Sequence, residues 1–279
     1  MLKKNQLFPK ILKSIKIPIF EKKFSMKINA ISGSVIGDII GSVYEFKSTK
    51  DYNFEMYNHN AHFTDDSVLT MSVAKTILEQ SNYDENLIKY YNTYPDRMYG
   101  PGFLNWIKTG VIQDSYGNGA PMRISAIGNH FTQSDLVLSE SRKAVEMTHS
   151  HPEGIKGAQS IALAIFMAKR GYSKKDIKEQ IQRHFFYDLN FSIEDIKDEY
   201  SFNATSQGSV PQSLMCFFES EDFESAIRLA ISLGGDSDTL ACMTGGIASV
   251  FYKDIPNEII IFCKERIPDE FIQIINMFD

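Results

Sequence analysis

The sequence predicts an all-α protein built as one compact multi-helix domain. Two observations indicate this fold class. Several segments place apolar residues at intervals of three and four, which is the period of an amphipathic helix. Runs that alternate β-branched and polar residues are scarce, and the intervening segments are rich in Gly, Pro and Asn, which favour turns. Four helices are expected, at residues 67–80, 154–170, 223–233 and 240–252.

The helix at 67–80 has apolar residues at mixed three- and four-residue spacings. The helix at 154–170 carries alanines at short intervals and ends at Gly171, a residue suited to a helix C-terminus. The segment 223–233 shows the helical spacing again, and 240–252 is rich in Ala and Gly. Because thin helices pack closely, these segments favour one shared core.

The composition is that of a globular protein. The chain has 279 residues, of which 43% are hydrophobic and 23% charged. Its net charge of −6 argues against non-specific binding of nucleic acid, but it does not exclude a small ligand that carries phosphate. No apolar run approaches the roughly 18 residues of a membrane span. Three cysteines without a CxxC pair fit reduced thiols and a cytoplasmic protein: Cys216, Cys242 and Cys263.

Residues 1–25 form a separate basic segment, in which seven lysines oppose the single acid Glu21. Its apolar residues are too interrupted for the core of a signal peptide. Three interpretations stay open: an extension upstream of an alternative start at Met26, an arm that binds a membrane surface or a partner, or a targeting peptide. Residues 26–279 contain no linker or repeat and are expected to form the functional domain.

Two acidic clusters precede expected helices: Thr64-Asp65-Asp66 and Asp236-Ser237-Asp238-Thr239. A Thr or Asp at a helix start, with acids in the first turn, caps the helix and suits its dipole, so each cluster alone is interpreted as a cap. Adjacent carboxylates repel unless a cation offsets their charge, and magnesium prefers such oxygen ligands. The matched pair therefore favours a metal site on which both clusters converge.

A third segment, Gly37-Asp38-Ile39-Ile40-Gly41, leads to Glu45 at the end of an apolar stretch. Its glycines permit a tight turn or close packing against another backbone. Burial would raise the pKa of Glu45 and suit this residue to general acid–base chemistry. Taken alone, the residue is interpreted as an ordinary solvated Glu.

The loop Ser115-Tyr116-Gly117-Asn118-Gly119 continues through Met122 to Arg123. Gly-Asn-Gly can expose consecutive N–H groups at positive φ and form an anion nest for a diphosphate, although a plain turn is the simpler interpretation. His149 and His151 could ligate a transition metal, but their spacing before a proline is a poor zinc pattern. We interpret them as part of a helix-start loop that lines a cleft.

Taken in order, these segments resemble the ADP-ribosylglycohydrolase family. The resemblance extends over residues 31–252, most of the chain, and leaves the basic extension outside. Each motif alone is weak evidence for the family, whereas all five motifs in the family's order are a specific signature. The motifs are Gly37–Gly41 with Glu45, Phe63–Ser67, Ser115–Arg123, Thr148-His149 and Gly234–Thr239.

The resemblance implies an all-α bundle whose cleft holds two magnesium ions, which manganese can replace. Glu45 matches an acid beside the metals in one subgroup, and Glu45 and Asp66 are expected to be catalytic. The implied metal ligands are Thr64, Asp65, Asp66, Asp236, Asp238 and Thr239. The implied ADP-ribose-binding residues are Ser115, Tyr116, Gly117, Asn118, Gly119, Met122 and His149, the last near the adenosine.

The implied reaction is magnesium-dependent hydrolysis of the glycosidic bond between ADP-ribose and a side chain or small acceptor. The sequence of the Ser115–Gly119 loop resembles that of family members that act on O-linked ADP-ribose, including serine-linked ADP-ribose, more than that of arginine-specific members. Pro121 and Lys253 depart from the family pattern without touching an implied ligand.

Two other function classes stay open. The first is a binding or structural protein of the same fold, since the family includes a lens crystallin relative; an intact ligand set argues against it. The second is an immunity protein whose basic extension blocks an ADP-ribosylating toxin partner. A metal phosphoesterase is a third possibility, because two-metal sites also cleave phosphate esters.

Overall fold

The computed structural model describes residues 25–279, and the regular secondary structure in this range consists of helices. The described residues contain no β-strand, and one isolated antiparallel bridge joins Gly117 to Thr205. The predicted all-α fold is confirmed. The basic extension lies outside the described residues except for Ser25. The elements are α1 (Ala30–Gly41), α2 (Asp65–Glu79), α3 (Tyr83–Thr93), α4 (Pro101–Thr109), η1 (Pro121–Arg123), α5 (Ser125–His130), α6 (Ser134–Val145), α7 (Pro152–Lys169), α8 (Lys174–Phe185), α9 (Ile193–Lys197), α10 (Ser206–Glu219), α11 (Phe223–Ser232), α12 (Ser237–Tyr252), α13 (Asn257–Lys264) and α14 (Asp269–Asn276).

The four predicted helices are present as α2, α7, α11 and α12, and their ends lie within three residues of the predicted ones. Both α2 and α12 begin earlier than predicted, so that Asp65 and Asp66, and likewise Asp238 and Thr239, lie inside the first turn. Apolar spacing does not reveal such a turn, because its residues are polar. Gly171 has a φ of +80° just after α7, as expected for a helix end.

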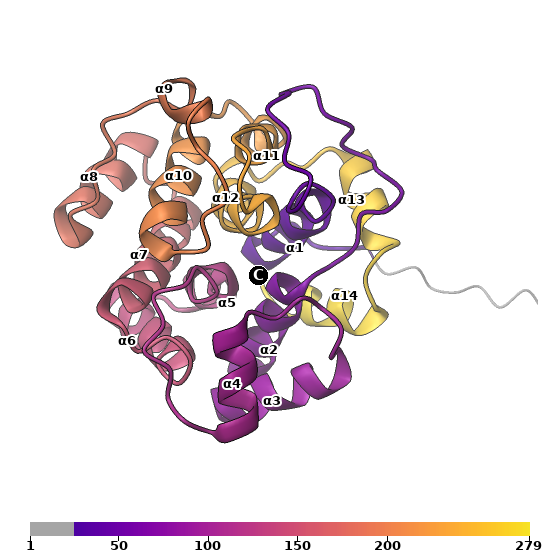
Figure 1. Cartoon of the computed structure of the whole chain (residues 1–279), viewed down its shortest axis with the longest axis vertical. Coiled ribbons are helices and arrows are strands. Elements are labelled where there is room, and N and C mark those ends of the chain that lie inside the picture. The colour runs from indigo at the N-terminus through magenta and orange to yellow at the C-terminus, as the bar shows by residue number, and fades with distance from the viewer. Residues whose placement is uncertain (1–24) are drawn as a thin grey trace, which may run out of the picture.

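Helices α1 and α12 lie side by side near the centre of the molecule (Figure 1). Their backbones approach closely because Gly33, Gly37 and Gly41 recur every four residues on one face of α1. A Cβ atom at Gly37 would overlap the carbonyl oxygen of Ala241, and one at Gly41 would overlap the Cα atom of Asp238. The predicted close backbone packing is confirmed, and it holds Asp238 directly against the end of α1.

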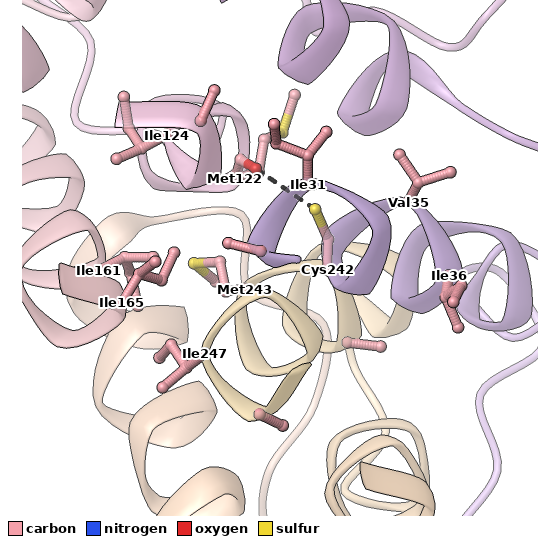
Figure 2. Close-up of a cluster of buried hydrophobic side chains, with 14 of the residues drawn as sticks. Ile31, Val35, Ile36, Met122, Ile124, Ile161, Ile165, Cys242, Met243 and Ile247 are labelled. Atoms are coloured by element: carbon pink, nitrogen blue, oxygen red, sulfur yellow. Dashed lines mark hydrogen bonds between the residues drawn. The ribbon is translucent and has the colours of Figure 1, made fainter. Parts of the chain in front are cut away.

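The core surrounds this pair. Helix α12 also packs against α7, α10 and α11, and α1 against α2, α5 and α13. Figure 2 shows part of the core, where Ile161 and Ile165 of α7 face Met243 and Ile247 of α12. Cys242 is buried without a disulfide and donates to the Met122 carbonyl at 3.3 Å. No helix within residues 25–279 combines the length and the apolarity needed to cross a membrane.

Candidate active site

A cavity of about 470 Å³ opens where the starts of α2 and α12 meet the loop before η1. One part of its wall is acidic, and another is apolar and includes Phe46, Met98, Tyr99 and Phe202. Most of the predicted site residues line it together. They are Glu45, Asp65, Asp66, Ser115, Gly117, Asn118, Gly119, Met122, His149, Asp236, Asp238 and Thr239.

The predicted convergence of the two acidic clusters is present. Carboxylate oxygens of Asp38, Asp66 and Asp238 lie within 4.8 Å of one another, and so do those of Glu45, Asp236 and Asp238. Asp238 belongs to both groups. Three elements supply these acids: the end of α1 with the loop after it, the start of α2, and the start of α12.

Asp66 links the clusters. Its Oδ2 atom accepts a hydrogen bond from Thr239 Oγ1 of α12 at 3.2 Å, and Thr64 Oγ1 lies 3.5 Å from the same oxygen. Its buried Oδ1 atom has no hydrogen-bond partner among the described residues. A buried, unpartnered carboxylate oxygen is costly in a protein, and a bound cation removes that cost.

Thr64 forms the predicted cap of α2. Its Oγ1 atom accepts from the Asp66 amide at 3.3 Å as the N-cap of α2, and donates to Asp38 Oδ1 at 2.6 Å. Thr64 is buried beneath the cavity and is not among the residues that line it. The structure therefore shows the cap, and the metal-ligand role of Thr64 stays a prediction.

Asp38 is a site residue for which the sequence analysis assigned no role. It is fully buried at the end of α1 and accepts hydrogen bonds from the amides of Thr64 and Ser67, each at 3.0 Å. It also accepts from the hydroxyls of both residues. Asp38 thus fixes the start of α2 against α1. The Gly37-Asp38 pair is visible in the sequence, but the role of Asp38 depends on Thr64 and Ser67, which lie at the start of α2.

Asp236 occupies the N-cap position of α12 but forms no capping hydrogen bond. Its Oδ2 atom instead accepts from Asn118 Nδ2 at 2.7 Å. Gly234 and Gly235 before it have φ values of +78° and +85°, a conformation that favours glycine. The cap interpretation is therefore wrong for the Asp236 side chain, which the turn directs to the cavity.

The environment of the buried acids disfavours their ionised form. Burial raises the pKa of Asp66 well above its ordinary range, and the neighbouring Asp38 and Asp65 raise it further. The pKa of Asp238 is raised well above its usual value by burial and by Asp236 and Asp66. Carboxylates crowded in this way are the donor set of a hard divalent cation, so the residues present fit a metal site.

Glu45 lies half-buried at the cavity, and its pKa is raised to about 7 by burial first and then by Asp236 and Asp38. The interpretation of Glu45 as an ordinary solvated residue is therefore wrong, and the raised pKa expected on burial is confirmed. The Oε2 atom of Glu45 is buried and has no hydrogen-bond partner in the described structure. At neutral pH this carboxyl group can both give and take a proton.

The Gly117–Gly119 loop differs from the predicted anion nest. Neither glycine has a positive φ. The Gly117 amide donates to Ser115 Oγ at 3.1 Å and the Asn118 amide to the Ala204 carbonyl at 2.9 Å, because the loop is bound to the segment before α10. The Gly119 amide has no hydrogen-bond partner in the described range. The expected row of free amides is wrong, the simpler interpretation as a turn is confirmed, and the Gly119 amide remains free among the described residues.

Tyr116 and His151 lie away from the cavity wall. The Tyr116 side chain is exposed, and its ring packs edge-on against His151 with centroids 5.3 Å apart. His151 Nδ1 accepts from the Glu153 amide at 3.1 Å and caps α7. The structure does not bring either ring to the acidic cluster.

His149 lines the cavity, and its Nδ1 atom lies 2.8 Å from Thr148 Oγ1. Arg123, to which the sequence analysis gave no role, is fully buried behind it. The Arg123 Nη2 atom donates to Thr148 Oγ1 at 2.6 Å. Burial and the Arg123 charge lower the pKa of His149 well below its ordinary value, so His149 is neutral at physiological pH.

The fold is all-α, and it brings buried carboxylates from two helix starts to one cavity. These two features define a class of proteins with an acidic centre suited to divalent cations. The chain belongs to the ADP-ribosylglycohydrolase family, whose profile it matches over residues 24–276.

Curated relatives are distant but extend over most of the chain. The ADP-ribosylhydrolase ARH3 of Mus musculus is 24% identical over 304 residues, covering 80% of this chain and 82% of the relative. ARH3 of Danio rerio is 26% identical over 301 residues, with 80% and 81% covered. An uncharacterized protein of Archaeoglobus fulgidus is 25% identical over 296 residues and covers 91% of this chain and 94% of its own length.

Among solved structures, a chain of an ADP-ribosylglycohydrolase-related protein complex superimposes with a TM-score of 0.70 at 20% identity. The match covers 89% of this chain and 94% of that one. This likeness shows the shared fold.

Proposed function

We propose that the protein is a metal-dependent ADP-ribosylhydrolase that cleaves the glycosidic bond between the distal ribose of ADP-ribose and an acceptor. The observation that carries this proposal is the meeting of the α2 and α12 acids at one cavity, with Asp66 Oδ1 and Glu45 Oε2 buried and unpartnered. Family membership and the ARH3 relatives support the substrate class.

Magnesium is the proposed ion, because every donor in the cluster is an oxygen. Two groups of acids that share Asp238 suit a pair of ions. Such ions would supply Lewis acidity and a template for the ribose hydroxyls and the attacking water. The residues proposed to hold them are Thr64, Asp65, Asp66, Asp236, Asp238 and Thr239.

Glu45 is the proposed proton carrier, because its raised pKa leaves both protonation states populated near neutrality. A bound cation would favour the ionised form of Asp66, and its negative charge beside the sugar would then favour an oxocarbenium-like transition state. Ser115, Gly119 and His149 line the wall that receives the rest of ADP-ribose. Their task is to bind and orient the substrate, which limits its freedom before reaction.

The proposed substrates are ADP-ribosylated proteins or small ADP-ribose adducts, with O-linked acceptors first. The test is a panel of Ser-, Arg- and Cys-linked ADP-ribosyl peptides and O-acetyl-ADP-ribose, with magnesium, with manganese and with a chelator. We expect turnover of at least one adduct with magnesium and a loss of at least a hundredfold with the chelator. Equal rates in both buffers would contradict the metal dependence.

The toxin-neutralising alternative depends on the basic extension, which lies outside the described residues, and no contact of the cavity favours it. The phosphoesterase alternative uses the same acids, and the products of the reaction separate it from glycosidic cleavage.

A further inference from the structure

Behind the cavity wall, Arg123, Thr148 and His149 form a chain of hydrogen bonds that fixes where the imidazole proton lies. We infer that Arg123 and Thr148 are positioning residues that hold His149 as a hydrogen-bond donor, with its Nε2–H group toward the cavity, where it binds an oxygen of ADP-ribose. The identity of this ligand rests on the proposed function. The tautomer of the imidazole rests on the hydrogen-bond geometry, and its neutral state on its burial beside the Arg123 charge.

The first link is the buried guanidinium. Arg123 is fully buried, and its Nη2 atom donates to Thr148 Oγ1 at 2.6 Å and to the Ala144 carbonyl at 3.2 Å. A guanidinium group has donors and no acceptor, so the Thr148 oxygen accepts in this contact. The Thr148 hydroxyl proton is therefore directed elsewhere.

The second link is the acceptor of the Thr148 hydroxyl proton. Two acceptors lie within reach of Thr148 Oγ1: the Val145 carbonyl at 3.2 Å and His149 Nδ1 at 2.8 Å. The Val145 carbonyl already accepts from the amides of Thr148 at 3.0 Å and His149 at 2.8 Å. The closer and otherwise unpaired Nδ1 atom is the better acceptor, so Thr148 donates to it.

The third link is the tautomer. A neutral imidazole whose Nδ1 atom accepts must carry its proton on Nε2. Burial and the positive charge of Arg123 oppose a second proton on the ring, as the lowered pKa of His149 indicates. His149 is thus a fixed donor and takes no part in proton transfer.

The Nε2 atom faces the glycine loop. A Cβ atom at Gly119 would lie 3.2 Å from His149 Nε2, and one at Gly117 would lie 3.4 Å from it. The Gly119 amide has no partner within the described residues, so two donors lie near each other at the cavity wall. Neighbouring donors suit an oxygen acceptor, such as a phosphate or ribose oxygen of ADP-ribose.

The experiment is long-range ¹H–¹⁵N NMR of the His149 ring at pH 7 in the full-length, ligand-free protein. The His149→Asn variant assigns its signals. We expect the Nε2–H tautomer in the wild type and in Thr148→Ser, which keeps the hydroxyl. Thr148→Val, which keeps the shape and loses the donor, is expected to show a mixture of tautomers. An Nδ1–H or doubly protonated ring in the wild type, or an unchanged ring in folded Thr148→Val, overturns the inference.

Calorimetry with ADP-ribose tests the ligand. We expect Thr148→Val to weaken binding by about tenfold, the size of one hydrogen bond, and to raise KM more than it lowers kcat. Thr148→Ser is expected to restore most of the affinity. A wild type that binds no ADP-ribose overturns the ligand assignment. A wild type that binds ADP-ribose with the expected tautomer but hydrolyses no adduct supports this inference and contradicts the proposed function instead.

Discussion

Asp66 at the start of α2 and Thr239 at the start of α12 are joined by a hydrogen bond of 3.2 Å, although 173 positions separate them in the sequence. This contact joins the acidic cluster before α2 to the one before α12, so that they form a single acidic centre. Each cluster taken alone looks like a helix cap. It depends on the packing of α1 against α12, since α1 carries Asp38, which holds the start of α2. The acids are therefore positioned by the core.

Asp66→Asn is expected to have opposite effects on stability with and without metal. In a chelating buffer the crowded carboxylates repel, so removing one charge should raise the free energy of unfolding by on the order of 1 kcal/mol. In magnesium the variant should be the less stable protein, because it binds the ion weakly. Thermal unfolding in the two buffers checks this.

The matched control is Asp84→Asn, since Asp84 also lies in the first turn of a helix but is exposed on α3. It should lose about 0.3–1 kcal/mol of helix-dipole stabilisation in both buffers alike. If Asp66→Asn behaved like this control, Asp66 would be a cap residue and the metal assignment would be wrong.

The pH dependence of the metal-free protein follows from the raised pKa values of Asp65, Asp66 and Asp238. Above about pH 4, where Asp ionises in an unfolded chain, the folded protein retains more protons. The stability from these groups is therefore full below about pH 4 and is lost as the pH rises through their folded pKa values. Chelated protein should melt at a lower temperature at pH 7.5 than at pH 5.5.

Magnesium should reverse this trend, because it binds the ionised acids. An ion present at a hundred times its Kd stabilises a protein by about 2.7 kcal/mol. Melting temperatures at both pH values, with and without magnesium, check the prediction. A chelated protein that is equally stable at the two pH values would contradict it.

Glu45→Gln is expected to separate binding from catalysis. The amide keeps the shape of Glu45 but cannot carry a proton, so kcat should fall by about 10²–10⁴ while ADP-ribose still binds. Steady-state kinetics and calorimetry of ADP-ribose binding measure the two effects. An unchanged kcat removes Glu45 from the mechanism.

Gly37→Ala should destabilise the protein through the α1–α12 contact. Its methyl group would overlap the Ala241 carbonyl oxygen, which belongs to a backbone and cannot rotate away. Overpacking of this kind costs about 1–3 kcal/mol. Gly102→Ala in α4 is the control, because a Cβ there meets nothing within 4 Å, and it should be neutral or stabilising by up to about 1 kcal/mol. Urea unfolding of both variants checks the contrast, and equal stabilities would contradict it.

The spacing of apolar residues predicted α2, α7, α11 and α12. It did not predict α1, because three glycines in twelve residues lower its helix propensity, and these same glycines serve the packing against α12. Helix α10 contains Gly208 and Pro211 and was missed for a similar reason. Propensity is a local property, and close packing between helices overrides it.

The candidate site was predicted well where a residue's chemistry is visible in its own segment, as for Asp66, Asp238 and Glu45. Asp38 and Arg123 were missed because their partners lie on other elements: the start of α2 for Asp38, and Thr148 for Arg123. The predicted anion nest is wrong because two of the three amides are already used: Asn118 donates to the Ala204 carbonyl, nearly ninety residues away, and Gly117 donates to Ser115 Oγ. Contacts between residues so far apart in the sequence become visible only in the folded structure.

The most direct test of the proposed activity is the mass spectrum of the products that the wild type and the Asp238→Asn variant form from a serine-linked ADP-ribosyl peptide in magnesium buffer. Glycosidic hydrolysis gives intact ADP-ribose and unmodified peptide from the wild type, and neither product is expected from the variant. Formation of AMP with a phosphoribosyl peptide would show cleavage of the diphosphate and contradict glycosidic hydrolysis. Equal product from the variant would contradict the role of the acidic centre.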